Sequence, residues 1–413
     1  MPFSTFKRSV RIERPAATVF AWHERPGAFE RLMPPWRRRG RFVHWEHRHY
    51  FESTPDGACV LTDEVSYRLP LGALGRVAGG ALARRELARL FAYRQAVTKA
   101  DLETTARYLS VRPMCFLIAG ASGLVGRALI PFLRTQGYTV VRLVRRPAAG
   151  VDEVSWDPAA GRLDAQAFRG VDVVINLAGE GVADVRWSTE RKKALLRSRV
   201  ESTRTLVNAM GALARGAPFV FISASATGIY GDRGNETLTE TSAPGAGFLA
   251  GVCEAWEREA LAAEALGVRV VRLRTGIVLT PAGGVLAKLL PLFRLGAGGR
   301  LASGRMWMSW IAIDDLVGAI YHAVLDRRCD GALNAVAPNA VTNAEFTRVL
   351  AQVLRRPALL PVPAAGLRVA LGEMADETVL ASARVVPGKL KGADYSFRHA
   401  TLTEALRHLL GRA

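Results

Sequence analysis

The first hundred residues alternate apolar and polar positions in short runs, a pattern typical of strands, before a longer stretch with helical spacing. Pro55-Asp56-Gly57 is a strong turn signal and indicates a hairpin between two of the strands. We expect a curved antiparallel sheet folded over one long helix. The predicted elements are a strand over Ser4–Glu13, a helix from Pro15 towards Arg31, strands over His44–Glu52 and Ala58–Leu69, and a helix over Ala81–Thr98.

From Met114 onward, short apolar strands alternate with amphipathic helices. Such alternation predicts an α/β fold with a Rossmann-type, doubly wound parallel sheet. The strands are expected over Cys115–Ala119, Thr139–Val144, Val171–Asn176, Phe219–Ser223 and Val268–Leu273, and the helices over Arg127–Gln136, Glu190–Leu213 and Val252–Leu266.

After about Pro338 the pattern becomes helical, with helices over Thr342–Leu354 and Leu402–Leu410. Either Thr342 or Asn343 could cap the first of these helices. We therefore expect three parts: a small α+β domain over residues 1–112, a dinucleotide-binding domain over 113–340 and a C-terminal module over 341–413, the module lying on the substrate side.

Composition narrows the function classes. The chain has 413 residues, 49% of them hydrophobic and 23% charged, which is typical of a soluble globular protein. It shows no signal peptide and no apolar run of about 18 residues, so we expect a cytoplasmic protein without a membrane partner. The net charge of +19 could attract nucleic acid. However, the excess arginine is dispersed, only Arg37–Arg41 is a compact run, and no nucleic-acid-binding motif accompanies it, so we expect a small-molecule substrate instead.

Cysteine and histidine give no metal signature. The four cysteines are widely spaced, which predicts reduced thiols. His47 and His49 alternate in a predicted strand and would share one face. No carboxylate or cysteine obviously joins them in sequence, so no metal site is predicted.

The strongest motif is the glycine-rich run Gly120-Ala121-Ser122-Gly123-Leu124-Val125-Gly126, which follows one predicted strand and opens a helix. In this context the first glycine permits a tight turn, the second admits a pyrophosphate and the third lets helix and strand pack closely. The helix N-terminus then offers free N–H groups to the phosphates. The run predicts dinucleotide binding.

The second strand of this unit ends in Arg145-Arg146, where an NAD-binding protein would carry an acidic residue for the ribose 2′-hydroxyl. Guanidinium groups can instead hold a 2′-phosphate. We therefore favour NADP(H) over NAD(H); the alternative is a pair of arginines that only face solvent.

The G-x-x-G-x-x-G spacing, Asn176-Leu177-Ala178-Gly179 and Asp314-Asp315 resemble the extended short-chain dehydrogenase/reductase superfamily. Trp187, Ser198-Arg199-Val200 and Val385-x-Pro387-x-Lys389-Leu390 are similar to an atypical, epimerase-like branch with its own C-terminal module. The resemblance implies cofactor contacts from Arg145, Arg146, Leu177, Ala178, Gly179, Arg199 and Ser223, and from the backbone of Cys253.

Catalysis is where the chain departs from this superfamily. The resemblance implies a Tyr-x-x-x-Lys pair near Leu249 and Cys253, and neither position carries the required group. Ser225 stands at the superfamily's substrate-binding serine, and Tyr230 is the candidate phenol. Cys253 lacks a histidine nearby in sequence, which disfavours a nucleophilic role.

Residues Ala21–Leu32 and Pro34-Pro35-Trp36 resemble the START-like, polyketide-cyclase-like domain, which implies a helix-grip fold with an apolar cavity. This copy is shorter, because only Arg37–Phe42 stands where that family has several more strands. Three functions follow as hypotheses: an NADP(H)-dependent oxidoreductase or epimerase, a catalytically silent cofactor-binding sensor or scaffold, and a carrier of an apolar ligand.

Overall fold

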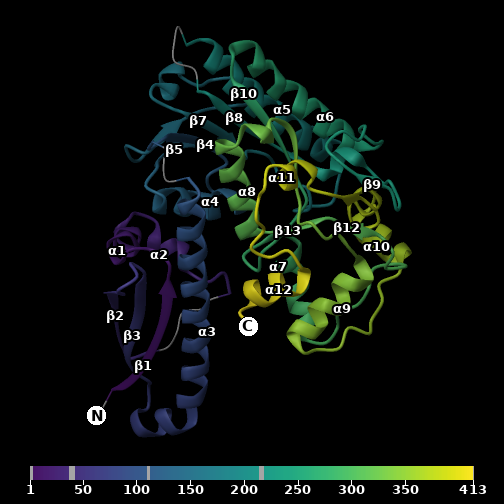
Figure 1. Cartoon of the computed structure of the whole chain (residues 1–413). Coiled ribbons are helices and arrows are strands. Elements are labelled where there is room, and N and C mark those ends of the chain that lie inside the picture. Colours follow the sequence, from purple (N-terminus) through teal and green to yellow (C-terminus); the bar gives the residue numbers. More distant parts are fainter. Residues whose placement is uncertain (1–2, 37–41, 109–111, 214–217, 413) are drawn as a thin grey trace. The chain divides into compact units, whose positions relative to one another are not determined.

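The computed structural model describes residues 3–36, 42–108, 112–213 and 218–412. The predicted basic run Arg37–Arg41 lies outside these residues. The chain divides into two compact units (Figure 1). The first comprises residues 1–112, 131–137 and 407–413, and the second comprises 113–130 and 138–406. Residues of the predicted C-terminal module up to 406 thus belong to the same unit as the predicted dinucleotide-binding domain.

The first unit contains a three-stranded antiparallel sheet in the order β1-β3-β2, as the alternating pattern predicted. Trp22, Leu61 and Val97 belong to one cluster of its buried core. Its elements are β1 (Ser4–Ile12), α1 (Ala16–Glu24), α2 (Ala28–Arg31), β2 (His44–Ser53), β3 (Cys59–Arg68) and α3 (Gly72–Ala106).

Helix α3 is much longer than the predicted Ala81–Thr98. Gly75, Gly79 and Gly80 lie in its first turns, and glycine has low helix propensity, so local sequence gives no reason to start the helix there. The buried side chains of Leu87 and Phe91, which pack in a core cluster with the sheet, show what stabilises the helix instead.

The second unit is built on a seven-stranded parallel sheet in the order β14-β10-β8-β7-β4-β5-β6, which confirms the predicted doubly wound fold (Figure 1). Strand order reverses at β4, with β5 on one side and β7 on the other. Ligands of such sheets bind beyond the carboxyl ends of the strands at this point. The strands are β4 (Cys115–Ala119), β5 (Thr139–Val144), β6 (Glu153–Ser155), β7 (Val173–Asn176), β8 (Val220–Ala226), β10 (Arg269–Thr275) and β14 (Gly331–Ala335).

Two helices pack against each other and share a buried core with the sheet, including Leu206 and Ala260 from the helices and Leu117 and Val174 from the strands. These are α5 (Thr189–Gly211) and α6 (Phe248–Leu261). The other α-helices within residues 113–340 are α4 (Leu124–Thr135), α7 (Gly284–Arg294) and α8 (Ile313–Leu325).

The C-terminal residues are joined to the rest of the unit by backbone pairing, because β16 runs parallel to β9 and β12 pairs with β15. Thr342, one of the two predicted caps, accepts a hydrogen bond from the backbone N–H of Glu345 (3.3 Å) and is the N-cap of α9. The remaining elements are β9 (Thr237–Leu238), β11 (Ile277–Leu279), β12 (Trp307–Met308), β13 (Trp310–Ala312), β15 (Val341–Thr342), α9 (Asn343–Leu354), α10 (Ala364–Leu371), a π-helical turn (Ala375–Val379), β16 (Arg384–Val385), α11 (Gly388–Gly392) and α12 (Leu402–Leu410).

Within the described residues, no helix combines the length and the apolar character needed to cross a membrane.

Candidate functional site

The glycine-rich loop occupies the turn between β4 and α4, at the point where strand order reverses. Gly120 has a φ of 79°, and a Cβ there would lie 2.6 Å from the carbonyl oxygen of Leu177. A Cβ on Gly126 would lie 2.5 Å from the carbonyl oxygen of Gly120. Both positions therefore require glycine for the loop to keep this shape.

Gly123 has a different environment. A Cβ there would meet only the carbonyl oxygen of Gly120, at 3.1 Å. Apart from this contact, the space next to Gly123 is open. A diphosphate needs this space above the first turn of α4. Ala121, Ser122, Leu124 and Val125 complete the loop and the first turn, whose N–H groups have no partner within the helix.

The loop after β7 runs beside the glycine-rich loop. Leu177 and Ala178 approach Gly120 with their backbone, and Asn176 holds the turn by accepting a hydrogen bond from the N–H of Ala178 (3.1 Å). The Arg199 side chain lies against Gly179 and donates to the carbonyl oxygen of Glu180 (2.9 Å).

Arg199 is a half-buried cation that stacks on the ring of Trp256, with its guanidinium carbon 5.2 Å from the ring centroid. Its guanidinium donates hydrogen bonds to the backbone carbonyls of Leu195 and Glu180. Among the described residues no carboxylate forms an ion pair with it. Burial lowers the pKa of its guanidinium, and the charge of Arg191 adds to this effect.

The two arginines after β5 differ in their contacts. Arg146 forms a bidentate ion pair with Glu153 of β6, with N–O distances of 2.8 and 2.7 Å. Arg145 is exposed, and within the described part of the chain no carboxylate pairs with it. Arg145 is therefore the arginine that is available to an anion.

Ser225, the predicted substrate-binding serine, is buried and donates to Glu257 of α6 at 2.8 Å. Glu257 also accepts hydrogen bonds from Arg274 (2.8 and 2.9 Å) and Arg272 (2.9 Å). Burial would lower the pKa of Arg274, but the hydrogen bonds and charge of Glu257 raise it above its usual range. Ser223 is buried on the same strand.

Tyr230, the predicted phenol, is fully buried. Its hydroxyl lies 2.7 Å from the Asn334 side-chain oxygen and 2.9 Å from the Thr239 carbonyl, and it accepts a hydrogen bond from Arg274 (3.0 Å). Burial raises the pKa of this phenol. These contacts favour a structural role for Tyr230 over the predicted catalytic one, because its O–H hydrogen is already donated within the protein.

The positions where the superfamily carries tyrosine and lysine lie in the first two turns of α6. Leu249 is half-buried, and Cys253 is buried with its pKa raised to about 11 by loss of solvent. Glu377, in the π-helical turn, accepts hydrogen bonds from the N–H groups of Phe248 (2.9 Å) and Leu249 (3.1 Å). A carboxylate from residues far along the chain thus stands beside the position of the absent tyrosine.

Three further side chains surround this end of α6. The Trp187 ring packs edge-on against Phe248 with centroids 5.1 Å apart. Lys192 lies 4.8 Å from the centroid of the Phe248 ring and pairs with Glu373 at 2.7 Å. Sequence reasoning singled out Trp187 by resemblance alone, and it missed Lys192, Glu373 and Glu377 because no local motif links residues so far apart.

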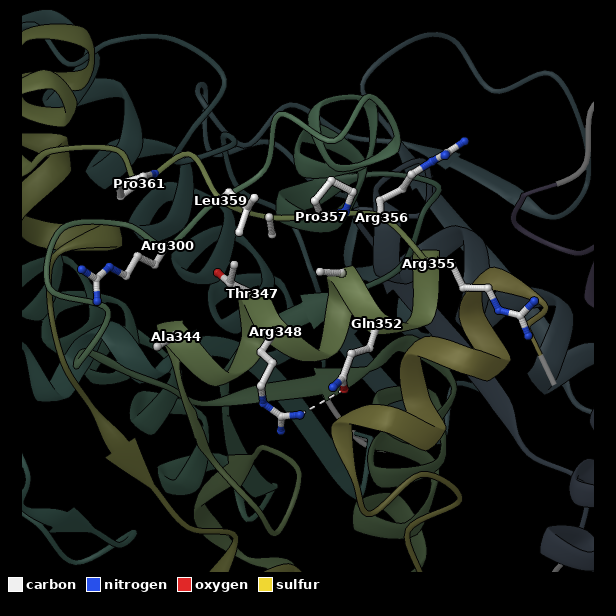
Figure 2. A pocket seen from close by; sticks show the side chains of 12 residues that line it. Arg300, Ala344, Thr347, Arg348, Gln352, Arg355, Arg356, Pro357, Leu359 and Pro361 are labelled. Carbon is white, nitrogen blue, oxygen red and sulfur yellow. Dashed lines mark hydrogen bonds between the residues drawn. The ribbon is translucent and has the colours of Figure 1, made fainter.

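A groove of about 820 Å³ lies elsewhere in the second unit, on α9 and the segment that follows it. In Figure 2, Arg348 donates a hydrogen bond to Gln352 on one side of the groove, and Pro357 and Leu359 lie on the other side. None of the predicted site residues lines this groove.

Comparisons with known proteins agree with the fold. Residues 116–335 match the model of the NAD dependent epimerase/dehydratase family, and residues 362–409 match a domain of unknown function, DUF1731. Epimerase family protein Mb2239 from Mycobacterium bovis is 42% identical over 295 residues, which cover 71% of this chain and 97% of that protein.

Two solved structures are also similar. A nucleoside-diphosphate sugar epimerase from Corynebacterium glutamicum has a TM-score of 0.80 and 33% identity, covering 98% of this chain and 90% of that one. Human epimerase family protein SDR39U1 (isoform 2), solved with NADPH, has a TM-score of 0.66 and 31% identity, covering 72% of this chain and 99% of that one. The chain described here belongs to the NAD-dependent epimerase/dehydratase family.

Proposed function

We propose that the chain binds NADP(H) and acts as an epimerase-like oxidoreductase on a small carbonyl, alcohol or sugar-like substrate. The cofactor would supply hydride transfer, while the protein would bind and orient both partners. The observation that carries the proposal is Arg145, an exposed cation without a carboxylate partner in the described chain, at the end of β5 beside the glycine-rich loop.

The residues present fit a dinucleotide phosphate. Gly120 lets the glycine-rich loop meet the loop after β7, and Gly126 lets the first turn of α4 pack on the start of its own loop; any larger residue would clash at either position. Gly123 leaves space above the first turn of α4. No acidic residue follows β5 directly, so the 2′-phosphate of NADP(H) would meet guanidinium rather than carboxylate. The human relative's structure with NADPH supports the same preference.

For proton transfer, Glu377 is the best-placed side chain. It stands at the N-terminus of α6, next to Leu249, where the superfamily's tyrosine is expected. A carboxylate at this position can take up or release a proton once substrate displaces its contacts with the two backbone N–H groups. Ser225 already donates its hydroxyl hydrogen to Glu257, so it would not transfer a proton. It would help only to form the substrate site, through its position on β8.

A second candidate is a catalytically silent NADP(H)-binding sensor or scaffold. The contacts of Ser225 and Tyr230 favour it, since both hydroxyls are buried and already hydrogen-bonded within the protein. An epimerase-like enzyme would have to rely on Glu377 and the cofactor alone for its proton and hydride steps.

Cofactor choice can be tested by titrating NADPH and NADH against wild type and single arginine variants, with nicotinamide fluorescence as the readout. We expect Arg145→Ala to weaken NADPH binding about 10–100-fold, the value of a charge-assisted contact, and to leave NADH binding unchanged. Arg169→Ala, an exposed arginine of the same unit, controls for the lost charge. Equal NADPH and NADH affinity in wild type would refute the NADP(H) preference.

The Arg146→Ala variant separates two interpretations of the arginine pair. If Arg146 only orders the loop through Glu153, the loss in NADPH affinity is smaller than for Arg145→Ala. An equal or larger loss would show that Arg146 holds the phosphate directly, as the family resemblance implies.

Turnover can be tested with a panel of carbonyls and nucleotide sugars, following NADPH oxidation and product stereochemistry. Gly123→Asp, which places a carboxylate in the phosphate space, serves as the inactive control. We expect activity in wild type and a fall in kcat of about 10²–10⁴-fold in Glu377→Gln, with unchanged NADPH affinity. Rates at the level of Gly123→Asp for every substrate would instead support the sensor or scaffold.

For the first unit we propose a shortened START-like origin, supported by its antiparallel sheet and long helix. Its core positions are filled by side chains such as Trp22, Tyr67 and Phe91, which favours a structural role over transport of an apolar ligand. We also propose that the whole protein is cytoplasmic.

A further inference from the structure

The sheet of the first unit brings together three groups that are separated in sequence. His47 and His49 lie two residues apart on β2 and therefore share a face. The antiparallel register places Asp63 of β3 directly opposite His49. No carboxylate of β2 lies on the face that these histidines share, and strand pairing supplies one.

The two imidazoles converge on one carboxylate oxygen. The Nε2 atom of His47 and the Nδ1 atom of His49 each lie 3.0 Å from Oδ1 of Asp63, and the two ring centroids are 4.1 Å apart. The Asp63 side chain is 3% exposed, whereas those of His47 and His49 are 14% and 31% exposed. The cluster is thus anchored in the core and open on one side.

We propose that His47, His49 and Asp63 form a binding site for a divalent transition-metal ion, with zinc the best match. Two imidazole nitrogens and one carboxylate oxygen are ligands that zinc prefers. Zinc binds such atoms at about 2.0–2.2 Å in a tetrahedron, which separates the ligand atoms by roughly 3.3 Å. The three atoms already lie within 4.8 Å of one another, so small side-chain movements suffice.

The surroundings of Asp63 resemble the outer shell of a metal site. Gln95 of α3 donates a hydrogen bond from its side-chain nitrogen to Oδ2 of Asp63 (2.8 Å) and thereby fixes the carboxylate. Arg8 of β1 donates to the side-chain oxygen of Gln95 (2.9 Å) and accepts from its nitrogen through the backbone carbonyl (3.1 Å). Such second contacts orient the direct ligands of metal ions.

His23 of α1 lies beside this cluster, with its ring centroid 5.2 Å from that of His49. Its Nδ1 is 2.8 Å from the carbonyl oxygen of Val19, so Nδ1 carries the proton and Nε2 keeps its lone pair. The Nε2 atom of His23 can therefore accept a hydrogen bond from a metal-bound water. A site with three protein ligands and one such position is open to an incoming ligand.

The test uses the full-length protein, stripped of metal with a chelator and then titrated with Zn²⁺ by calorimetry. We expect a binding step in wild type that is weakened about 10–100-fold or lost in His49→Gln and in Asp63→Asn. His44→Gln changes a histidine on the same strand outside the cluster and should leave this step unchanged. Equal Zn²⁺ affinity and stoichiometry in wild type and His49→Gln would overturn the proposal.

Cobalt provides a readout that depends on no variant. Co²⁺ bound by two imidazoles and a carboxylate in a near-tetrahedral site gives intense visible absorption, unlike hydrated Co²⁺. We expect these bands in wild type, their displacement by Zn²⁺, and their loss in His49→Gln, with circular dichroism confirming that the variant is folded. Wild-type protein without such bands would refute the site even if every variant unfolded.

Discussion

Glu257 and Asp315 are two of the buried carboxylates in the second unit, and the chain compensates them in different ways. Glu257 is 4% exposed and accepts hydrogen bonds from two arginines and a serine. Asp315 is 1% exposed and accepts from the backbone N–H groups of Arg398 (2.6 Å) and His399 (3.1 Å).

The choice of partners has a consequence for the pKa of Asp315. Burial raises the pKa of Asp315 to about 6, and neither the two N–H groups nor the charge of Arg398 offsets this fully, while the charge of Asp314 adds to it. Glu257 has guanidinium groups in direct contact instead. The comparison teaches that a buried carboxylate can be held here by backbone amides alone or by guanidinium groups that also bring opposite charge.

Removing Glu257, the carboxylate that pairs with arginines, should have the largest effect on stability. In Glu257→Ala, buried Arg274 loses its carboxylate partner, and we expect the free energy of unfolding to fall by about 3–5 kcal/mol. Chemical denaturation measures this change. Glu259→Ala on the same helix removes a more exposed pair with Arg204 and should cost about 1 kcal/mol or less. Similar losses in both variants would contradict the special role of Glu257.

Asp315, whose partners are backbone N–H groups, should instead make the free energy of unfolding depend on pH. The folded-state pKa of Asp315, about 6, exceeds its ordinary value of 3.8, so the folded state holds more protons between these values. Its contribution to stability is therefore present below about pH 4 and lost as pH rises through 6, by about 3 kcal/mol.

The measurement compares unfolding free energies of wild type and Asp315→Asn from pH 4 to pH 7.5. The variant cannot titrate at this position, so the difference between the two proteins isolates the Asp315 contribution. We expect the wild type to lose stability relative to the variant as pH rises. A pH-independent difference would show that Asp315 stays charged in the folded protein.

Tyr230→Phe should give the smallest effect and sharpen the distinction between structure and catalysis. Removing the hydroxyl leaves Asn334 and Arg274 without one hydrogen-bond partner each, which we expect to cost about 1–3 kcal/mol. NADPH affinity should stay unchanged in a fluorescence titration. Loss of turnover without loss of stability would restore Tyr230 as a catalytic residue.

The sequence predicted much of the fold because the signals are local. Cys115–Ala119 and Thr139–Val144 were predicted with the bounds that the structure shows, since each is a compact apolar run bounded by turn residues. Short strands such as β6 (Glu153–Ser155) were missed because three residues carry too little periodicity to detect.

Side-chain partnerships were harder to predict. The glycine-rich loop can be recognised from its own spacing. Nothing near Arg146 in sequence, however, shows that Glu153 will pair with it, or that Arg145 will have no carboxylate partner among the described residues. Glu377 meets α6, and Asp63 meets His49, only through tertiary packing and strand register. Contacts of this kind depend on the folded chain as a whole.

The carboxyl-terminal residues give the second unit a further property. Glu377 closes the amino end of α6, and β16 continues the chain alongside β9. A fragment that stopped at residue 335, where the match to the epimerase family ends, would expose the N–H groups of Phe248 and Leu249 and the edge of β9 to water. We therefore expect recombinant production of that fragment alone to yield aggregated material, because the two matched stretches depend on each other for folding.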